Sequence, residues 1–383
     1  MAFRFLHTGD WHIGKPFGRF DDETAPLLRN ARLEAVGRIA AAARARGISH
    51  VVVAGDVYDQ PGLADSALRK LIERLRANQD VIWHMLPGNH DPARDDGVWQ
   101  RLAAFGLPEN VHVHAEPTVT EISPGVDLLA APCSSHQMAA DPTQWMDEAP
   151  RRDGAFRIGL AHGPVHGFGG EETPSGMIRP SRRESAGLDY LALGDWHGAK
   201  EIAPGVWYAG TPEPDQFPDN EPGFVLGVEL EAPGALPKVE RIEIAQYHWY
   251  RRKYEASDMM DAAAIIEDLK SLDGDPERCL LRVYVEGEIS LSEDAALRAQ
   301  LEELAPAFLH LDARLDKLSI PIDATVGNDL GAAHFAPLIE RLMAHRADCK
   351  PQPGHQLPKE AEIAQRSLQL LARYSRAISR RVS

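Results

Sequence analysis

Five short polar clusters in this chain contain residue types that bind divalent metal ions and transfer protons. Each follows a short apolar run: Asp10-Trp11-His12, Gly55-Asp56, Pro87-Gly88-Asn89-His90-Asp91, His162-Gly163 and Gly194-Asp195-Trp196-His197. Their donors are carboxylates, amides and imidazoles without cysteine, which argues against a structural zinc site. Two divalent ions held about 3.5–4 Å apart can polarise a phosphoryl group and activate water for in-line attack. The clusters therefore indicate a two-metal hydrolytic site.

Each cluster taken alone also has an ordinary structural explanation. Residues 87–91 combine Pro, Gly, Asn and Asp, which favour turns for backbone reasons. Five clusters, each placed where a strand should end, favour one shared site over separate turns. Asp10 and His12 are two residues apart, a spacing that suits chelation of a single ion.

The segments before the first three clusters have the pattern of a parallel sheet. Residues 3–6 alternate, and residues 51–54 form the continuous apolar run of a buried central strand. Helical periodicity over 23–46 and roughly 63–77 separates these strands from the next one, at 81–86. Parallel strands joined by right-handed crossovers place the loops that follow them on one edge of the sheet. The side chains expected to converge there are Asp10, His12, Asp56, Asn89 and His90.

Later strands predict a second sheet and complete the expected fold. Short alternating runs between 111 and 131 are followed by strands at 156–161, 190–193, 206–209 and 224–230. We therefore expect an α/β (α+β) protein whose core is a two-sheet β-sandwich flanked by helices.

Three parts are expected along the chain. Residues 1–245 carry the clusters, residues 246–333 read as a smaller α+β module without a catalytic cluster, and residues 334–383 read as a helical tail. The last helix has an apolar stripe and a basic face. Packing on its own protein and docking to a partner both explain that pattern.

Composition limits the function and the compartment. The net charge of −16 argues against binding nucleic acid through a globally basic surface, yet leaves room for a nuclease with local basic patches. The three cysteines, Cys133, Cys279 and Cys349, are far apart and suggest no disulfide framework. The sequence shows no signal peptide and no apolar run near the roughly 20 residues that span a bilayer. We expect a cytoplasmic protein that does not enter a membrane.

The order of the clusters resembles a known family. Asp-x-His, Gly-Asp-x-x-Asp, Gly-Asn-His-Asp, His-Gly and Gly-x-x-His, between residues 10 and 197, resemble the calcineurin-like metallophosphoesterases over roughly residues 1–230. Residues 6–14 are similar to the opening of SbcD-type DNA repair exonucleases, especially YhaO-type relatives, and residues 208–213 are similar to a segment those nucleases carry. Asp91 stands where protein Ser/Thr phosphatases have Glu, which favours the nuclease branch.

The resemblance implies a role for each cluster. The implied ligands are Asp10, His12 and His197 for the first metal, Asn89, His162 and Asp195 for the second, and Asp56 as the bridge. His90 would protonate or stabilise the departing oxygen, with Asp59 orienting it. The family usually has His where Asp195 stands. A carboxylate there is a harder donor, which should favour Mn²⁺, with Mg²⁺ as the other fitting ion.

The implied activity is that of a DNA phosphodiesterase, an exonuclease or endonuclease in repair. SbcD-type nucleases work beside an SbcC-like coiled-coil ATPase, and the family commonly forms homodimers, so both partners are implied here. The basic residues Arg179, Arg182 and Arg183 are the best local candidates for a DNA backbone contact, with a solvated helix start as the alternative. A phosphomonoesterase or small-molecule phosphodiesterase of the same superfamily, and an inactive scaffold subunit, stay open as other functions.

Overall fold

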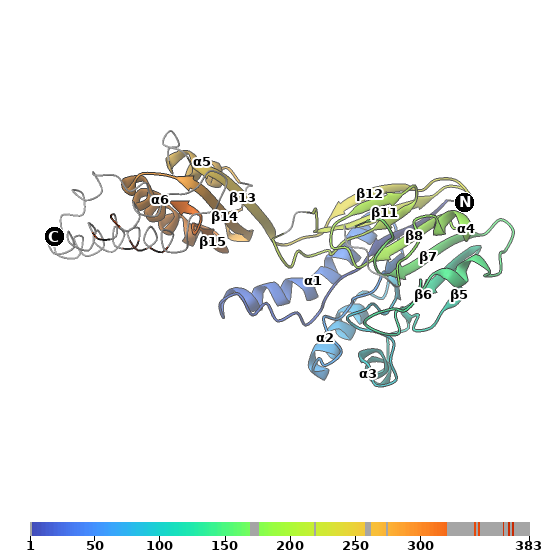
Figure 1. Ribbon diagram of the computed structural model, residues 1–383. Coiled ribbons are helices and arrows are strands. Elements are labelled where there is room, and N and C mark those ends of the chain that lie inside the picture. The colour runs from blue at the N-terminus through green and yellow to red at the C-terminus, as the bar shows by residue number, and fades with distance from the viewer. Residues whose placement is uncertain are drawn as a thin grey trace. The chain divides into compact units, whose positions relative to one another are not determined.

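The computed structural model describes residues 2–168, 176–217, 220–256, 262–272 and 275–319, together with five isolated positions: Arg341, Ala344, Ile363, Ser367 and Leu370. The chain divides into two compact units, residues 1–249 and 250–383 (Figure 1). Apart from the isolated positions, the predicted helical tail, residues 334–383, lies outside the described residues. The predicted boundaries at residues 245 and 333 stay predictions.

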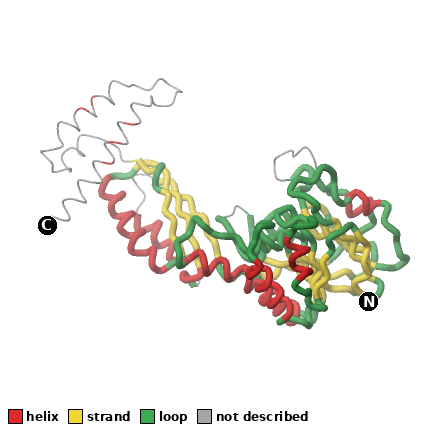
Figure 2. The backbone as a smooth tube through the Cα atoms, turned by 90° about the horizontal axis from the view of Figure 1, so that it is seen from below, coloured by secondary structure: helices red, strands yellow, loops and turns green. Residues whose placement is uncertain are grey.

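The first sheet of unit one carries the first three clusters. Its strand order is β12-β11-β1-β2-β3-β4, where β1 to β4 are parallel and β11 is antiparallel to both of its neighbours, β1 and β12. The strands are β1 (Phe3–Thr8), β2 (His50–Val53), β3 (Ile82–Met85), β4 (Val111–Val113), β11 (Phe224–Leu230) and β12 (Lys238–Glu243). The helices that pack on its outer face are α1 (Thr24–Ala45), α2 (Asp65–Arg76) and α3 (Val98–Ala104) (Figures 1 and 2).

The second sheet of unit one carries the last two clusters. Its strand order is β5-β6-β7-β8-β10-β9, with β6, β7, β8 and β10 parallel. The strands are β5 (Thr118–Ser123), β6 (Val126–Ala131), β7 (Phe156–His162), β8 (Tyr190–Gly194), β9 (Lys200–Ala203) and β10 (Val206–Tyr208). Two short helical segments accompany it, η1 (Gln144–Asp147) and α4 (Arg182–Ser185).

Alternation of side chains explains why these strands read as unbroken apolar runs. In β2, Val52 packs between the two sheets, whereas Val51 and Val53 pack beneath the helices, because successive side chains point to opposite faces. Both faces of the strand are therefore buried. Phe5 on β1 and Leu160 on β7 belong to the same layer between the sheets as Val52. The predicted two-sheet sandwich flanked by helices is confirmed.

Unit two has a sheet and a core of its own. Its elements are β13 (His248–Ala256, which begins at the end of unit one), α5 (Ala262–Lys270), η2 (Pro276–Arg278), β14 (Cys279–Glu288), α6 (Leu291–Leu304), η3 (Ala305–Ala307), β15 (His310–Arg314) and β16 (Leu318–Ser319). The strand order is β13-β14-β15, with β16 also pairing with β14. Helix α6 begins at a capping box formed by Ser290 and Glu293. The described helices of the chain include none long and apolar enough to cross a membrane.

Candidate metal centre

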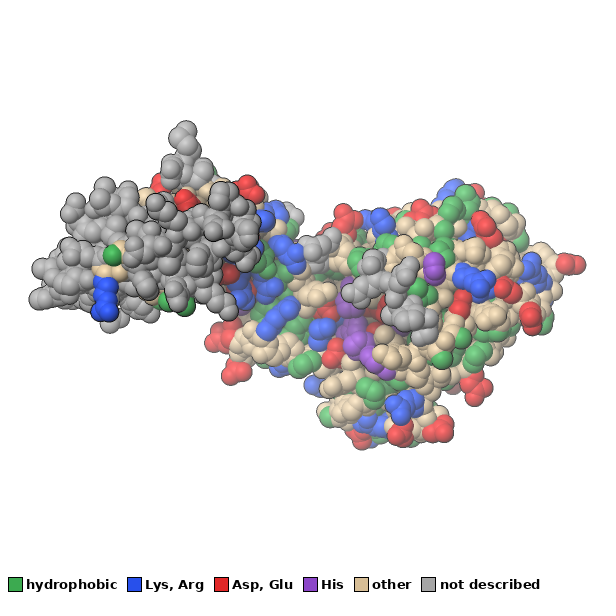
Figure 3. Space-filling model, viewed as in Figure 1, with side chains coloured by type: hydrophobic (Ala, Val, Ile, Leu, Met, Phe, Trp, Pro, Cys, Tyr) green, Lys and Arg blue, Asp and Glu red, His purple; other side chains and the backbone are tan. Residues whose placement is uncertain are grey.

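Every predicted ligand follows or ends a parallel strand. Asp10 and His12 follow β1, Asp56 follows β2, and Asn89 and His90 follow β3 in the first sheet. The second sheet contributes His162, the last residue of β7, and Asp195 and His197, directly after β8. The carboxyl ends of parallel strands form the usual ligand site of such sheets. Figure 3 shows histidine side chains gathered at one place on the surface of this unit.

Five predicted ligands and the predicted acid, His90, come together in three overlapping groups. The groups are Asp10, His12 and His197; His12, Asp56 and His90; and Asp10, Asp56 and His162. Within each group, one donor atom from every residue lies within 4.8 Å of the others. Asp10 and Asp56 each belong to two groups, so a carboxylate is shared between neighbouring positions as a two-metal site requires.

The backbone at these loops adopts a conformation that side chains other than glycine rarely take. In the described part of the chain five non-glycine residues have a positive φ, and four are predicted ligands: Asp10 (54°), His12 (44°), Asp56 (50°) and Asp195 (112°). Such backbone conformations are unfavourable and concentrate at functional sites, where surrounding structure enforces them. The strain is evidence that these side chains are aimed at a common point.

Two glycines allow the loops to approach each other. A Cβ atom at Gly88 would overlap the carboxylate and the backbone nitrogen of Asp56, and one at Gly194 would overlap the carbonyl oxygen of Ala54. Because both neighbours are parts of the site, neither can move aside without displacing a predicted ligand.

Backbone carbonyls fix the tautomer of two imidazoles. His162 Nδ1 lies 2.9 Å from the carbonyl oxygen of Ala54, and His90 Nδ1 lies 2.9 Å from that of Asp59. A carbonyl can only accept, so both Nδ1 atoms carry the proton and both Nε2 atoms are left for another partner. His162 Nε2 faces Asn89 Oδ1 at 3.3 Å and Asp56 Oδ1 at 3.4 Å.

One buried oxygen tests whether these residues fit a cation. Asp10 Oδ2 is buried and makes no hydrogen bond, while Oδ1 accepts from the backbone N–H of Asp195 at 2.9 Å. Next to it, His12 Nε2 and His197 Nε2 face each other at 3.2 Å. An unpartnered carboxylate oxygen and two converging imidazole nitrogens are the donors that a divalent ion takes, so the residues fit the metal.

Burial and charge shift the pKa values of the ligands in opposite directions. Burial raises the pKa of Asp10 to about 7 and lowers that of His12 to about 4. For Asp56, burial acts to raise the pKa, but the charge of the neighbouring His162 imidazole brings it below its usual range. Opposed shifts among grouped titratable residues are typical of functional sites.

Comparison with known protein families identifies the family of this chain. The sequence pattern of the Metallophos family, described as calcineurin-like phosphoesterase, matches residues 3–199. The chain belongs to this family. It is therefore a metal-dependent hydrolase, and the predicted family and type of enzyme are confirmed.

Two curated relatives give a narrower likeness. The SbcD component of the SbcCD nuclease from Rhodobacter capsulatus is 35% identical over 130 residues, which cover 33% of this chain and 29% of the relative. The DNA double-strand break repair protein Mre11 from Halobacterium salinarum is 32% identical over 110 residues, covering 28% and 27%. The chain thus spans under a third of the length of these relatives. The solved structure of TT1561 from Thermus thermophilus matches 64% of this chain and 100% of its own, with 14% identity and a TM-score of 0.43.

Within this phosphoesterase, Asp59 contacts His90 through its main chain. Its backbone carbonyl, not its carboxylate, contacts His90. The carboxylate oxygen Oδ1 instead lies 3.3 Å from His12 Nδ1. The sequence could place Asp59 near His90 but could not say which of its two oxygen-bearing groups would face that imidazole. The contact between Asp59 and His90 is therefore made by the Asp59 main chain.

The three predicted basic residues have different environments in this phosphoesterase. Arg182 is 2% exposed, and its guanidinium pairs with Asp141 and Asp147. That side chain is committed to the fold, because it joins α4 to the segment around η1. Arg183 donates to the backbone carbonyl of Asp189 at 3.2 Å, and Arg179 is exposed. Of the predicted set, Arg179 and Arg183 are left for a phosphate contact.

Four residues of the site were missed by the sequence reasoning. The four are Lys15, Arg32, His136 and Asp215. The buried Arg32 guanidinium, on α1, donates to the backbone carbonyls of Trp11, Asp10 and Glu213 and so braces the first metal loop. The spacing of residues in the sequence does not reveal that an arginine on a helix contacts a distant loop. Asp215 follows the segment 208–213 and could have been found by extending that likeness by two residues.

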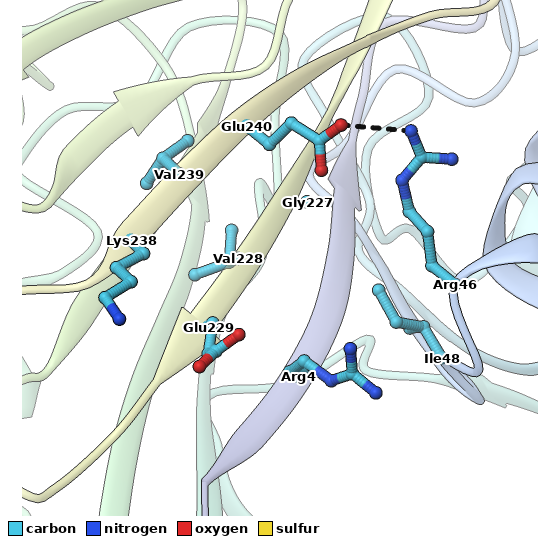
Figure 4. Close-up of a pocket in the computed structure, with 9 residues that line it drawn as sticks. All are labelled: Arg4, Arg46, Ile48, Gly227, Val228, Glu229, Lys238, Val239 and Glu240. Carbon is cyan, nitrogen blue, oxygen red and sulfur yellow. Dashed lines mark hydrogen bonds and ion pairs between the residues drawn. The ribbon is translucent and has the colours of Figure 1, made fainter.

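A separate surface pocket lies elsewhere on unit one. It has a volume of about 230 Å³ and is lined mainly by β1, β11 and β12 and by the end of α1 (Figure 4). Arg46 Nη2 and Glu240 Oε1 form an ion pair there at 3.0 Å. None of its lining residues belongs to the predicted metal centre, so it offers control positions for experiments on that centre.

Proposed function

We propose that this protein is a manganese-dependent phosphodiesterase that hydrolyses DNA in repair, with Mg²⁺ as an alternative ion. The observation that supports it most is the buried Asp10 carboxylate, which belongs to the same donor group as two imidazoles and whose Oδ2 makes no hydrogen bond. The names of the two relatives, a nuclease component and a double-strand break repair protein, support DNA as the substrate class. The family membership supports the hydrolysis.

The proposed ligand sets are those of the sequence prediction. They are Asp10, His12 and His197 for one ion, Asn89, His162 and Asp195 for the other, and Asp56 between them. When bound, the two cations supply Lewis acidity at the phosphoryl group and activate the attacking water. Asp195 contributes a carboxylate, with Oδ1 3.8 Å from His162 Nε2, so the second donor set keeps an acidic member where the family usually has His. This supports a catalytic protein over a scaffold.

His90 completes the reaction on the leaving-group side. Water forms a new bond to phosphorus and releases a proton to solvent, while the bond from phosphorus to the departing deoxyribose oxygen breaks. That oxygen leaves with a proton from Nε2 of the His90 imidazolium, whose other proton is held on Nδ1 by the bond to the carbonyl oxygen of Asp59. The backbone N–H of His90 donates to Asp56 Oδ1 at 2.9 Å, which holds the acid next to the proposed bridging carboxylate. An alkoxide leaving group needs such an acid more than an activated phenolate does.

We further propose a cytoplasmic location, an SbcC-like coiled-coil ATPase partner and a homodimer, as the likeness to the SbcD component of SbcCD suggests. The residues described here include no feature that identifies either interface. A monoester phosphatase of the same superfamily is the alternative activity. Its test is the ratio of rates on p-nitrophenyl phosphate and on DNA.

The decisive experiment is degradation of end-labelled single- and double-stranded DNA with and without Mn²⁺. Wild type should degrade DNA only with the metal, and both Asp56→Asn and His90→Ala should lose this activity. Glu240→Gln, which removes a carboxylate at the separate pocket, should behave as wild type. Hydrolysis of monoesters without hydrolysis of DNA would contradict the proposal.

A further inference from the structure

The two imidazoles of the first metal site each have a carboxylate behind them. His12 and His197 face each other through Nε2. On the far side of the rings, His197 Nδ1 is hydrogen-bonded to Asp215 Oδ1 at 3.3 Å, and His12 Nδ1, which has no hydrogen-bond partner, lies 3.3 Å from Asp59 Oδ1. Each ring thus presents one nitrogen to the proposed metal and the other to an aspartate.

A single lysine lies between the two aspartates. Lys15 Nζ is 2.7 Å from Asp215 Oδ2 and 3.9 Å from Asp59 Oδ1. The Lys15 side chain is 30% exposed, while that of Asp215 is 3% exposed. The lysine therefore lies between the buried Asp215 carboxylate and solvent. Each oxygen of Asp215 therefore has its own partner, an imidazole for Oδ1 and an ammonium for Oδ2.

We propose that Asp215 and Asp59 are positioning residues that set the affinity of the first metal through His197 and His12. A carboxylate behind a ligating imidazole fixes its orientation and tautomer and raises its basicity. The inference rests on the proposed function in one respect, the assignment of Asp10, His12 and His197 to one cation. In this proposal the Asp59 carboxylate supports the metal ligand His12. The backbone carbonyl of Asp59 orients His90.

Asp215 is held in place by contacts that do not involve its carboxylate. Arg32 Nη2 donates to Thr211 Oγ1 at 3.0 Å, and Arg32 Nη1 donates to the carbonyl oxygen of Glu213 at 2.7 Å. Arg19 donates to the backbone carbonyl of Asp215 itself at 3.0 Å. The segment 211–215 is therefore anchored by its main chain and by Thr211. Asp215→Asn should remove the negative charge without displacing this segment.

Glu213 provides a matched control two residues away. It is also buried, but its carboxylate accepts from the backbone N–H groups of Gln246 and Tyr247, at 2.9 and 3.0 Å, and pairs with Arg38. No imidazole contacts it in these interactions. Glu213→Gln therefore removes a buried carboxylate from the same segment without touching a predicted metal ligand.

The test measures Mn²⁺ binding directly on the full chain by the electron paramagnetic resonance signal of free Mn²⁺. Wild type should bind two ions, and Asp215→Asn should weaken one of them by about 10- to 100-fold, the usual effect of losing such a supporting carboxylate. Asp59→Asn should weaken the same ion by a similar factor. Glu213→Gln should bind both ions as wild type does, even if its melting temperature falls. Hydrolysis by Asp215→Asn should recover at high Mn²⁺.

The outcomes separate this inference from the proposed function. Wild type that binds no Mn²⁺ would contradict both. Wild type that binds two ions and degrades DNA, with unchanged affinity in Asp215→Asn, would overturn the positioning role alone. Equal losses in Asp215→Asn and Glu213→Gln would also overturn it, since they would indicate a general effect on the segment. If Asp215→Asn does not fold, Asp59→Asn decides on the same criteria.

Discussion

Unit one contains two groups of neighbouring histidines that differ in what surrounds them. The first is the metal centre. The second, which we call the histidine ladder, consists of His50, His84, His112 and His114 on and just after strands β2, β3 and β4. In the ladder, His84 bonds on both sides, with Nε2 3.2 Å from His50 Nδ1 and Nδ1 3.4 Å from His114 Nε2. The rings of His84 and His112 stack at 5.3 Å.

Carboxylates distinguish the two groups. Among the residues that the structure describes, none of the ladder histidines pairs with a carboxylate. Burial lowers the pKa of His84 to about 2 and that of His114 to about 4, with repulsion from neighbouring imidazoles adding to it. In the metal centre burial also acts to lower the pKa of His197, but Asp215 reverses the direction and raises it. Burial thus favours the neutral form of His84 and His114, which are packing groups, whereas the candidate centre combines its imidazoles with carboxylates.

The backbone conformations of the two groups also differ. His50, His84 and His112 lie within strands and have no positive φ, whereas His12 and three of the predicted carboxylate ligands have one. The described residues offer no metal-binding group in the ladder. Among the described residues, loops with a positive φ bring carboxylates to the histidines of the candidate metal centre and not to those of the ladder.

The largest expected effect comes from removing the shared carboxylate of the metal centre. Asp56→Asn should lower the rate of DNA hydrolysis by at least about a thousandfold, because metal-ion catalysis supplies several kcal/mol and each 1.4 kcal/mol is a factor of about ten. His84→Gln in the ladder should leave the rate within a few fold. The measurement is the initial rate at saturating Mn²⁺. A ladder variant as inactive as Asp56→Asn would show that the two groups do not differ in function.

A smaller loss is expected when the acid is removed but the metals stay. His90→Ala should lower the rate on DNA by about a hundred- to ten-thousandfold, the usual contribution of a general acid. The loss on bis(p-nitrophenyl) phosphate should be much smaller, because that leaving group does not need a proton. Unchanged Mn²⁺ binding would serve as the control. Equal losses on both substrates would argue against an acid at this position.

Through the ladder, pH should change the unfolding free energy of the protein and not its catalytic rate. His84 and His114 have folded-state pKa values of about 2 and about 4, both below the unfolded value of 6.5. The stability that depends on their neutral form is complete above pH 6.5 and is lost as pH falls toward the folded values. Each group should cost up to about 1.4 kcal/mol of unfolding free energy per pH unit in that range.

Urea denaturation at about pH 7 and about pH 5, on either side of the unfolded pKa of histidine, measures this cost. His84→Gln cannot become charged, so it should reduce the pH dependence relative to wild type. An unchanged dependence in His84→Gln would show that the ladder does not stay neutral on folding. This would remove the contrast with the metal centre.

The same contrast shows which features of the fold and of the site could be predicted from the sequence. Strand, helix and cluster order predicted the sandwich and placed Asp10, His12, Asp56, Asn89 and His90 at one edge of the first sheet, because parallel strands must end together. The place of His197 was implied by the family resemblance. That order did not predict the ladder, since a histidine inside a strand, such as His84, has no spacing signal. Nor could it predict Lys15 or Asp215, whose roles depend on distances between loops far apart in the chain. The burial of Arg182 was not predicted, because the spacing of basic residues in the sequence does not show which carboxylates a side chain will contact.

The smallest expected effect concerns His136, a residue of the site that lies beside the proposed acid His90. It is exposed, donates from Nδ1 to the carbonyl oxygen of Asn89 at 3.0 Å, and its ring lies 5.8 Å from that of His90 at 79°. Its open Nε2 is therefore held beside the proposed acid. Loss of one hydrogen bond costs about 0.5–1.5 kcal/mol, so His136→Ala should reduce kcat on DNA by a few fold. Gln137→Ala, at the exposed neighbouring position, should leave kcat unchanged. Equal kcat in both variants would limit the functional histidines to those that carboxylates surround.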